Sequence, residues 1–215
     1  MPQLKIGFFI YPGVTALDVV GPAQVLSQLP EAKILFVAQS QKSIPTDAGF
    51  TMLATHTFEE CGQLDIICIP GGPGQSAVMH DEAVLSFVNQ QGLGARYVTS
   101  VCTGSLLLAK AGLLEGRRAA CHWAWRDALS DWGAKPQDAR VVEDRNRITG
   151  GGVTAGIDFG LSLVAKVAGE QTAQAIQLGL EYRPEPPFDA GSPETTEPAI
   201  VARVKALFVK HYALT

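Results

Sequence analysis

The 215-residue sequence predicts an α/β fold, a doubly wound, mostly parallel sheet with helices on both faces. Three observations lead to this prediction. Short apolar runs alternate with helix-forming segments along the chain, as consecutive βαβ units require. The run LDIICIP at 64–70 is apolar without alternation and stops at glycines, which is typical of a strand buried on both faces. The composition, 47% hydrophobic with 22 glycines, supplies a large core and many turns.

The predicted elements follow one another in a regular order. LKIGFFI at 4–10 and AKILFVAQ at 32–39 are strands that flank a helix from Asp18 to Gln28, and residues 43–55 form an irregular extended segment or hairpin. The later elements are strands at 64–70, 97–101 and 117–121, extended segments at 139–143 and 146–149, and helices at 81–91, 103–111, 123–132, 154–168, 171–180 and 195–211.

The chain is expected to form a single domain over residues 1–215, because it contains neither an internal repeat nor a linker. The Pro-rich stretch at 182–198 is too short to separate two domains and predicts a fixed surface loop, or an arm that packs on a partner. A net charge of −4 gives no basic surface for nucleic acid. The first apolar run is too short for a signal sequence and no membrane span is present, so the cytoplasm is the expected compartment.

Four cysteines remain to be placed, and their spacing excludes the common structural roles. No pair forms a CxxC motif and no two histidines have ligand spacing, so neither a structural zinc site nor a disulfide framework is expected. Cys61, Cys68 and Cys121 are predicted to be small buried side chains. Cys102 differs from them because it lies where a strand changes into a helix.

The segment SVCTG at 100–104 matches a nucleophile elbow, a small residue and a glycine flanking a nucleophile at a strand-to-helix turn. Such a turn exposes the side chain, the helix N-terminus favours a thiolate, and the next N–H can stabilise an oxyanion. A buried structural cysteine that ends a strand is the alternative interpretation of Cys102.

Two other strand ends carry residues of chemical interest, and ligands in such sheets bind beyond the carboxyl ends of the strands. The first strand leads to Asp18, and the strand at 64–70 ends in PGGPG, whose amides can point at a ligand. A carboxyl beside a cysteine serves as a general acid if a partly dry pocket raises its pKa. Asp18 alone is also explained as a helix N-cap, and the two roles are compatible.

Five segments together resemble the ThiJ/PfpI superfamily, over residues 4 to about 195, and within it the isocyanide hydratases. They are DVVGP, CIPGGPG, SVCTGSLLLAKAGLLEGRRAACHW, TGGGVTAGIDF and EYRPEPPFDAGSP. The resemblance implies a flavodoxin-like sheet of ThiJ/PfpI type and a lyase that adds water to an isocyanide, giving an N-substituted formamide.

The resemblance also implies roles for individual residues. Cys102 is the nucleophile, Asp18 lies against it, and Thr103 supplies a hydroxyl and an N–H. The binding residues are Gly72, as a second oxyanion amide, and Gly151, Gly152 and Val153, which shape the pocket. Neither a metal nor an organic cofactor is expected, and the partners are a small-molecule substrate and a second copy of the chain.

His122 has two possible interpretations. It lies twenty residues after Cys102, and a Cys–His pair is a common activation device, yet a histidine at a helix start can simply bond to backbone. We expect a supporting role for it outside direct catalysis. Protease-like relatives place histidine directly after the nucleophile, where this chain has Thr103, which argues against peptidase activity.

Two alternatives to a hydratase stay open. One is a cofactor-free glyoxalase or related cysteine hydrolase that uses Cys102 with His122. The other is a ligand- or redox-sensing domain such as transcription regulators carry, although the residues after AGSP leave little room for a helix-turn-helix pair. A homodimer is also expected, because Val19, Val20, Ala23, Val25 and Leu26 give the first helix more apolar surface than one sheet face needs.

Overall fold

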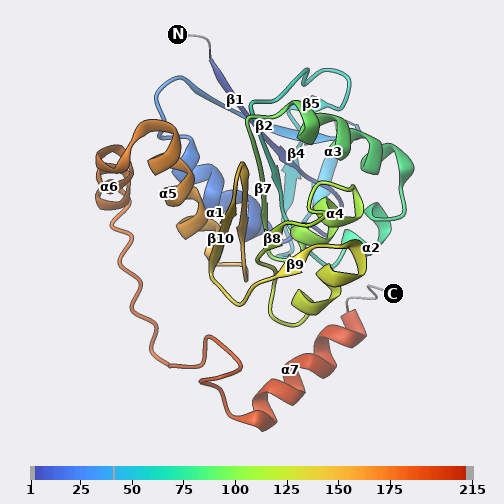
Figure 1. The fold of residues 1–215 in the computed structure, drawn as a ribbon, viewed down its shortest axis with the longest axis vertical. Helices are drawn as coiled ribbons and strands as arrows, with labels where there is room; N and C mark the ends of the chain where they lie inside the picture. The colour runs from blue at the N-terminus through green and yellow to red at the C-terminus, as the bar shows by residue number, and fades with distance from the viewer. Residues whose placement is uncertain (1–2, 41, 212–215) are drawn as a thin grey trace.

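Within residues 3–40 and 42–211, which the computed structural model describes, seven strands form a central sheet in the order β10-β11-β7-β6-β1-β2-β5. Neighbouring strands run parallel except β10 and β11, so the predicted mostly parallel sheet is confirmed (Figure 1). The strands are β1 Leu4–Phe9, β2 Ala32–Ala38, β5 His56–Thr57, β6 Ile66–Ile69, β7 Tyr97–Val101, β10 Val141–Asp144 and β11 Arg147–Gly150.

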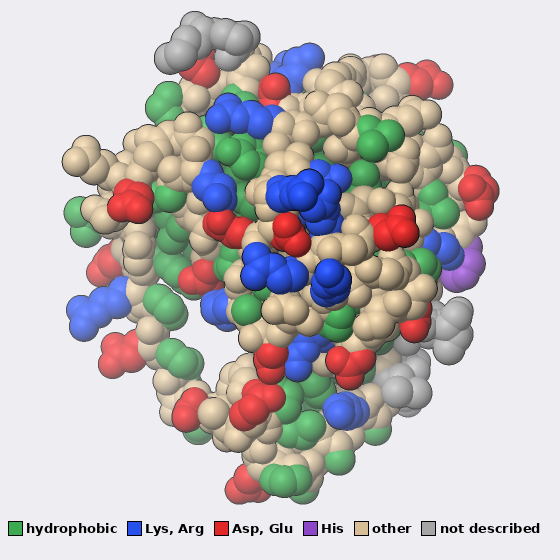
Figure 2. All heavy atoms as spheres, viewed as in Figure 1, with side chains coloured by type: hydrophobic (Ala, Val, Ile, Leu, Met, Phe, Trp, Pro, Cys, Tyr) green, Lys and Arg blue, Asp and Glu red, His purple; other side chains and the backbone are tan. Residues whose placement is uncertain are grey.

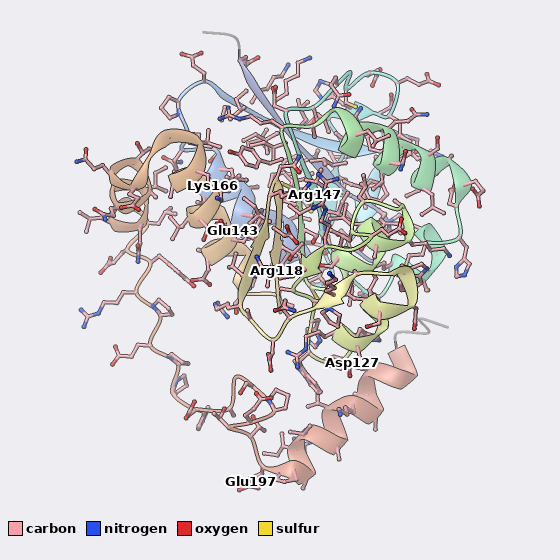
Figure 3. The ribbon with its side chains drawn as sticks, viewed as in Figure 1. Arg118, Asp127, Glu143, Arg147, Lys166 and Glu197 are labelled. Carbon is pink, nitrogen blue, oxygen red and sulfur yellow. The ribbon has the colours of Figure 1, made fainter. Side chains whose placement is uncertain are left out.

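Helices cover both faces of the sheet, as Figure 1 shows. Helix α1 (Ala16–Leu26) packs against α5 (Ala155–Ala168) on one face, and α6 (Glu170–Gly179) lies beside α5. On the other face lie α3 (Glu82–Gly94) and α4 (Gly104–Lys110), with the short helix α2 (Gln75–Val78) nearby. The ion pair between Lys166 of α5 and Glu143 of β10, at 2.8 Å, fastens α5 to the edge of the sheet (Figure 3).

The apolar runs of the sequence account for the core. All four residues of β6 are buried, because helices cover both faces of this central strand. Phe8, Ile6 and Phe159 are among the large side chains with no exposure. Burial of each such side chain contributes about 1.5–3 kcal/mol to the free energy of unfolding.

Two regions of the fold differ from the sequence prediction. The helix expected at 123–132 is a 3-10 helix over Arg126–Trp132, which Gly133 ends in the left-handed conformation. Residues 43–55 form the hairpin that is one of the two predicted forms, made of β3 (Ser43–Pro45) and β4 (Thr51–Leu53), in which Ile44 pairs with Met52. The strand predicted at 117–121 is present as β8 (Arg118–Ala119), whereas helix α2 and the strand β9 (Lys135–Pro136) that pairs with β8 are additional. These elements are two to four residues long, too short for a hydrophobic period to be visible in the sequence.

Residues 183–197, here called the C-terminal arm, lead away from α6 to the last helix, α7 (Pro198–His211). The arm stands off the body in Figure 1, and open space separates it from the domain in Figure 2. The face seen in Figure 2 mixes both signs of charge. Among the described helices, none combines the length and the apolar character that crossing a bilayer would require.

The chain order places a switch point at the middle of the sheet. From β1 the chain moves outward to β2 on one side, whereas β6 and then β7 pair on the other side of β1. The loops that leave β1 and β6 meet at the carboxyl ends of the strands, where the Thr15 N–H donates to the Gly71 carbonyl at 2.9 Å and the Gly74 N–H donates to the Gly13 carbonyl at 3.1 Å.

Candidate active site

Cys102 lies at the end of β7, in the sharp turn that leads into α4. Its φ is 60°, a left-handed conformation that few residues other than glycine adopt and that is common at functional turns. The Cys102 N–H donates to the carbonyl oxygens of Gly150 and Gly151, at 3.1 and 2.7 Å, which holds the turn against the end of β11. The strand-to-helix elbow predicted from SVCTG is present in the fold.

Gly104 explains why the elbow needs a glycine after the threonine. A Cβ atom there would lie 2.1 Å from the carbonyl oxygen of Ile69, at the end of β6. Only a residue without a side chain lets α4 begin this close to the neighbouring strand. The close approach brings the residues around Cys102 next to the PGGPG loop.

Asp18 is buried on the first turn of α1, with 1% of its surface exposed. Its Oδ2 accepts a hydrogen bond of 2.8 Å from the Gly71 N–H, whereas Oδ1 has no well-formed hydrogen bond within residues 3–40 and 42–211. The pKa of Asp18 is raised to about 8: burial is the largest cause and the nearby charge of Asp47 also raises it, while the Gly71 amide and the Cys102 thiol act in the opposite direction. Asp18 is therefore mostly a neutral acid at pH 7.

The alternative role of Asp18 as a helix N-cap is wrong. Helix α1 begins at Ala16 with Thr15 as its N-cap residue, and the Ala16 N–H donates to Asp47, at 3.0 Å. The Thr15 hydroxyl donates to the same carboxylate, at 2.7 Å. Asp47, from the loop after β3, thus satisfies the start of the helix and leaves the Asp18 carboxyl free to face Cys102.

The pKa of the Cys102 thiol is raised well above its ordinary value, first by burial and then by the charges of Asp18 and Cys121. Hydrogen bonds from the N–H and side chain of Thr103 lower it. The sequence alone favours a thiolate at the start of α4, but in the fold burial and the neighbouring carboxyl oppose the effect of the helix. Asp18 and Cys102 therefore form a coupled pair in which the charge of either group raises the pKa of the other.

Asp18, Gly72, Cys102 and Thr103 lie together at one place, here called the corner. Within it, Thr103 and Gly72 are in direct contact. The Gly72 N–H donates to Thr103 Oγ1 at 3.3 Å, and Thr103 is fully buried. The Gly71 Cα faces both Thr103 and Asp18, so closely that a Cβ on it would overlap them. In this structure the Gly72 amide is bound to Thr103, and its action as an oxyanion donor stays a prediction.

His122 lies four residues before the 3-10 helix and is largely buried. The Ala124 N–H donates to its Nδ1 at 3.3 Å, and burial lowers the pKa of His122 to about 4. The ring packs against Trp125 and Phe208, with centroids 5.2 Å apart in both pairs. The imidazole is therefore neutral at pH 7, with one nitrogen already accepting a backbone hydrogen bond.

A cavity of about 420 Å³ begins at Gly151, whose carbonyl accepts from the Cys102 N–H, but neither Cys102 nor Asp18 lines it. Gly151, Gly152 and Val153, the predicted pocket residues, form part of its wall together with His122, Cys121 and residues 191–194 of the C-terminal arm. Arg126 and Arg140 also face the cavity, and each is paired, with Asp138 and Asp158 respectively. Charged side chains thus form part of the cavity wall.

Sequence reasoning missed three residues of the site. Gly71 supplies the amide that holds Asp18, Asp47 caps α1, and Gln75 bonds to Thr103. The glycine pair in PGGPG gives a signal for Gly71, since both glycines begin the same loop. Asp47 and Gln75 lie in segments that carry no motif, so only the fold reveals them.

The chain is similar to known proteins over most of its length. The DJ-1/PfpI family model matches residues 4–166. The chain belongs to the DJ-1/PfpI family. It is 50% identical over 198 residues to the isonitrile hydratase of Pseudomonas putida, covering 92% of this chain and 87% of that protein. A ThiJ/PfpI family protein from Pseudomonas syringae superposes with a TM-score of 0.96 at 44% identity, covering 100% of this chain and 89% of that chain.

A transcription regulator is a more distant relative. The HTH-type regulator GbdR of Pseudomonas aeruginosa is 28% identical over 185 residues, which cover 81% of this chain but only 49% of the regulator. The similarity thus extends over about half of the length of this regulator.

Proposed function

We propose that this member of the DJ-1/PfpI family is an isocyanide hydratase that converts an isocyanide and water into an N-substituted formamide. The observation that carries the proposal is the buried pair of Asp18 and Cys102, in which the acid has a pKa of about 8. The 50% identity to an isonitrile hydratase supports the same reaction. The proposed steps use only this pair and water, without metal or organic cofactor.

The first step joins the substrate to the enzyme. The reacting pair holds one proton, shared between the Asp18 carboxyl and the Cys102 sulfur. Sulfur forms a bond to the terminal carbon of the isocyanide while Asp18 gives that carbon the proton. The products are a thioimidate on Cys102 and an Asp18 carboxylate, so the total charge is unchanged. A carboxyl that stays protonated near neutral pH suits this step because the carbon needs an acid as well as a nucleophile.

The second step releases the product. The Asp18 carboxylate takes a proton from water as the hydroxyl oxygen bonds to the thioimidate carbon. The former isocyanide nitrogen takes up the hydroxyl proton, the C–S bond breaks, and the formamide leaves. Sulfur departs as a thiolate beside protonated Asp18, which restores the starting pair. The main-chain N–H of Thr103, next to the sulfur, stabilises charge that develops there.

The glyoxalase-like alternative fits the geometry less well. It needs His122 as a base, but the pKa of His122 is lowered to about 4 and its Nδ1 already accepts from Ala124. A sensing role is supported by the distant GbdR similarity alone. We therefore place His122 in a supporting position, where it shapes the cavity wall.

A homodimer with twofold symmetry is part of the proposal. Leu17 and Val20 on α1 are 39% and 41% exposed, beside buried Asp18. They line an apolar surface groove of about 370 Å³ together with Ile157, Leu180 and Tyr182. A second copy of the chain is the occupant that we propose for it, since one patch on α1 and α5 can face its own symmetry mate. Light scattering should give twice the 22.8 kDa chain mass at micromolar concentration; 23 kDa with full activity contradicts the proposal.

The cytoplasm is the compartment that we propose. The four cysteines, all within the described residues, are free thiols. Free buried thiols are typical of proteins from reducing compartments.

A panel of substrates tests the proposed function. Purified protein is given an aromatic isocyanide, methylglyoxal or a peptide, and products are separated by chromatography. We expect formamide from the isocyanide and no turnover of the other two. Lactate from methylglyoxal without formamide would establish the glyoxalase-like alternative instead, and a protein that binds ligand without turnover would favour a sensor.

A further inference from the structure

Tyr11, two residues past the end of β1, has a buried hydroxyl that contacts the loop holding Asp18. Its side chain is 2% exposed, and the hydroxyl donates to the Pro70 carbonyl at 3.0 Å. Pro70 is buried and follows Ile69, the last residue of β6, so its carbonyl lies beyond the paired part of the strand. A buried carbonyl needs a donor, and here a side chain supplies it. No step of the proposed reaction uses Tyr11.

The carbonyl that Tyr11 binds belongs to the same peptide group as the amide that binds Asp18. A peptide group is rigid, so the Pro70 carbonyl and the Gly71 N–H point in opposite directions and turn together. The Gly71 N–H donates to Asp18 Oδ2 at 2.8 Å. Any rotation that releases the carbonyl from Tyr11 therefore also turns the amide away from the Asp18 carboxyl. One hydrogen bond fixes the direction of the other.

Gly71 does not hold this peptide group in place by itself, because a glycine has no Cβ to limit its backbone angles. A larger residue does not fit, since a Cβ there would lie 2.5 Å from Thr103 Oγ1 and 3.1 Å from Asp18 Oδ2. The Thr15 N–H, at 2.9 Å, binds the Gly71 carbonyl, which belongs to the next peptide group. The orientation of the Pro70–Gly71 group thus depends on a hydrogen bond from another element.

We propose that Tyr11 is a positioning residue that orients the Pro70–Gly71 peptide group and so keeps the Gly71 amide on the Asp18 carboxyl. A hydrogen bond to the carbonyl also polarises the amide, which strengthens the bond that the amide donates. The amide favours the charged form of Asp18, whereas burial opposes it, so Tyr11 limits how far burial raises the pKa of Asp18. The inference rests on the proposed role of Asp18, but its first test needs no isocyanide.

The first test is the pH dependence of stability in Tyr11→Phe, which removes the hydroxyl and keeps the ring. The pKa of Asp18 should rise by about half a unit or more, since a full hydrogen bond to a charged group corresponds to about one unit. The folded chain then keeps the Asp18 proton to higher pH, while the unfolded chain releases it near 3.8 as before. From pH 5 to pH 9 the folding equilibrium constant, measured in urea, should fall about threefold more than in wild type.

A double-mutant cycle assigns this change to Asp18. The other titratable groups that face its carboxyl are Asp47, Cys102 and, at longer range, Cys121. Asp18→Asn removes the titrating carboxyl and keeps these neighbours, so in this background Tyr11→Phe should cost the same stability at pH 5 and pH 9. Measurements stop at pH 9 because tyrosine side chains ionise near pH 10. An extra loss that persists in the Asp18→Asn background would overturn the inference.

The matched control is Thr99, whose buried hydroxyl donates to the Ile67 carbonyl at 2.9 Å, within β6 itself. Thr99→Val and Tyr11→Phe each take one buried hydroxyl from a carbonyl of this region, so both lower stability at every pH. The Thr99 hydroxyl also contacts Cys68, whose pKa is raised to about 12, above the range measured. Thr99→Val should keep the wild-type change between pH 5 and pH 9. Equal changes in Thr99→Val and Tyr11→Phe would contradict the inference.

Isocyanide turnover gives a second test, which stays readable if Tyr11→Phe folds only in part, because a midpoint does not depend on the folded fraction. The midpoint of kcat/KM against pH should move up by about half a unit in Tyr11→Phe, lowering activity at pH 7 about threefold. Thr99→Val should keep the wild-type midpoint. An unshifted midpoint in Tyr11→Phe would overturn the inference. The stability change without isocyanide turnover by wild type would refute the proposed function and leave the role of Tyr11 intact.

Discussion

The corner around Cys102 and the C-terminal arm are held in opposite ways. At the corner Asp18, Thr103 and Gln75 are each at most 1% exposed, and every position is fixed by hydrogen bonds to backbone of another element. The arm is largely exposed, with 79% of Phe188 open to solvent. It is fastened near its two ends. Tyr182 donates to Asp158 at 3.1 Å, and Phe208 of α7 packs on His122, Trp123 and Trp125.

The difference indicates how each region can serve the reaction. Burial excludes water from the corner, and this raises the pKa of a carboxyl there. The hydrogen bonds between elements keep that carboxyl at a fixed position beside the thiol. A lightly held arm cannot do this, but its residues 191–194 form part of the cavity wall. We therefore expect changes at the corner to affect kcat, and changes in the arm to affect substrate binding.

Asp18→Asn should give the largest effect after loss of the nucleophile. The amide keeps the shape and can still accept from Gly71, but it cannot deliver a proton, so kcat should fall by about 100-fold or more. His122→Ala should cost less, because the neutral imidazole lies in the cavity wall. Steady-state assays of both variants decide the matter. A larger loss in His122→Ala would favour the glyoxalase-like alternative.

The pH dependence of kcat/KM should follow the protonation of the Asp18–Cys102 pair. The pKa of Asp18 is raised to about 8, so below that pH the pair holds two protons instead of the one that the first step requires. Activity should rise by about tenfold per pH unit up to about pH 8 and then level off. In Asp18→Asn the residual activity should lose this midpoint. A wild-type profile that is flat between pH 6 and 9 would show that the corner does not control the proton.

The raised pKa of Asp18 lowers the free energy of unfolding at high pH. The unfolded chain releases the Asp18 proton near 3.8, whereas the folded chain keeps it to about 8. Between these values the folded state binds more protons, so the contribution of Asp18 to the free energy of unfolding is lost as pH rises. Urea unfolding should therefore show that Asp18→Asn gains stability relative to wild type from pH 5 to pH 9. An equal difference at both pH values would contradict the raised pKa.

Phe208→Ala should have the smallest effect and tests the arm. Loss of the contacts with His122, Trp123 and Trp125 removes about 1 kcal/mol of aromatic packing. We expect proteolysis within residues 183–197 to become faster and KM to rise a few-fold, with kcat unchanged. A loss of kcat as large as that of Asp18→Asn would mean that the arm belongs to the reacting corner.

The sheet could be predicted from the sequence because buried strands and amphipathic helices give rise to characteristic spacings of apolar residues. It also brings Cys102 and Asp18 to one end of the sheet, since both follow strands. The contacts between side chains of different elements, by contrast, could not be predicted from the sequence. Whether Asp18 caps its helix depends on Asp47, which arrives from the loop after β3, 29 residues later in the chain.

Ionisation is equally hidden from the sequence. The pattern SVCTG favours a thiolate, but burial and the facing carboxyl raise the pKa of the Cys102 thiol. Gln75 carries no motif, and its bonds to Thr103 appear only when α2 packs beside the elbow. These properties come from packing between elements and not from the order of residues within one of them.

The most direct test of the account is formamide production by wild type and by Cys102→Ala. Both proteins, at matched concentration and with thermal unfolding recorded to confirm folding, are incubated with an aromatic isocyanide, and the formamide is quantified by chromatography. The account predicts steady turnover by wild type and none above the uncatalysed rate by the variant. Full activity in Cys102→Ala would remove the covalent mechanism altogether.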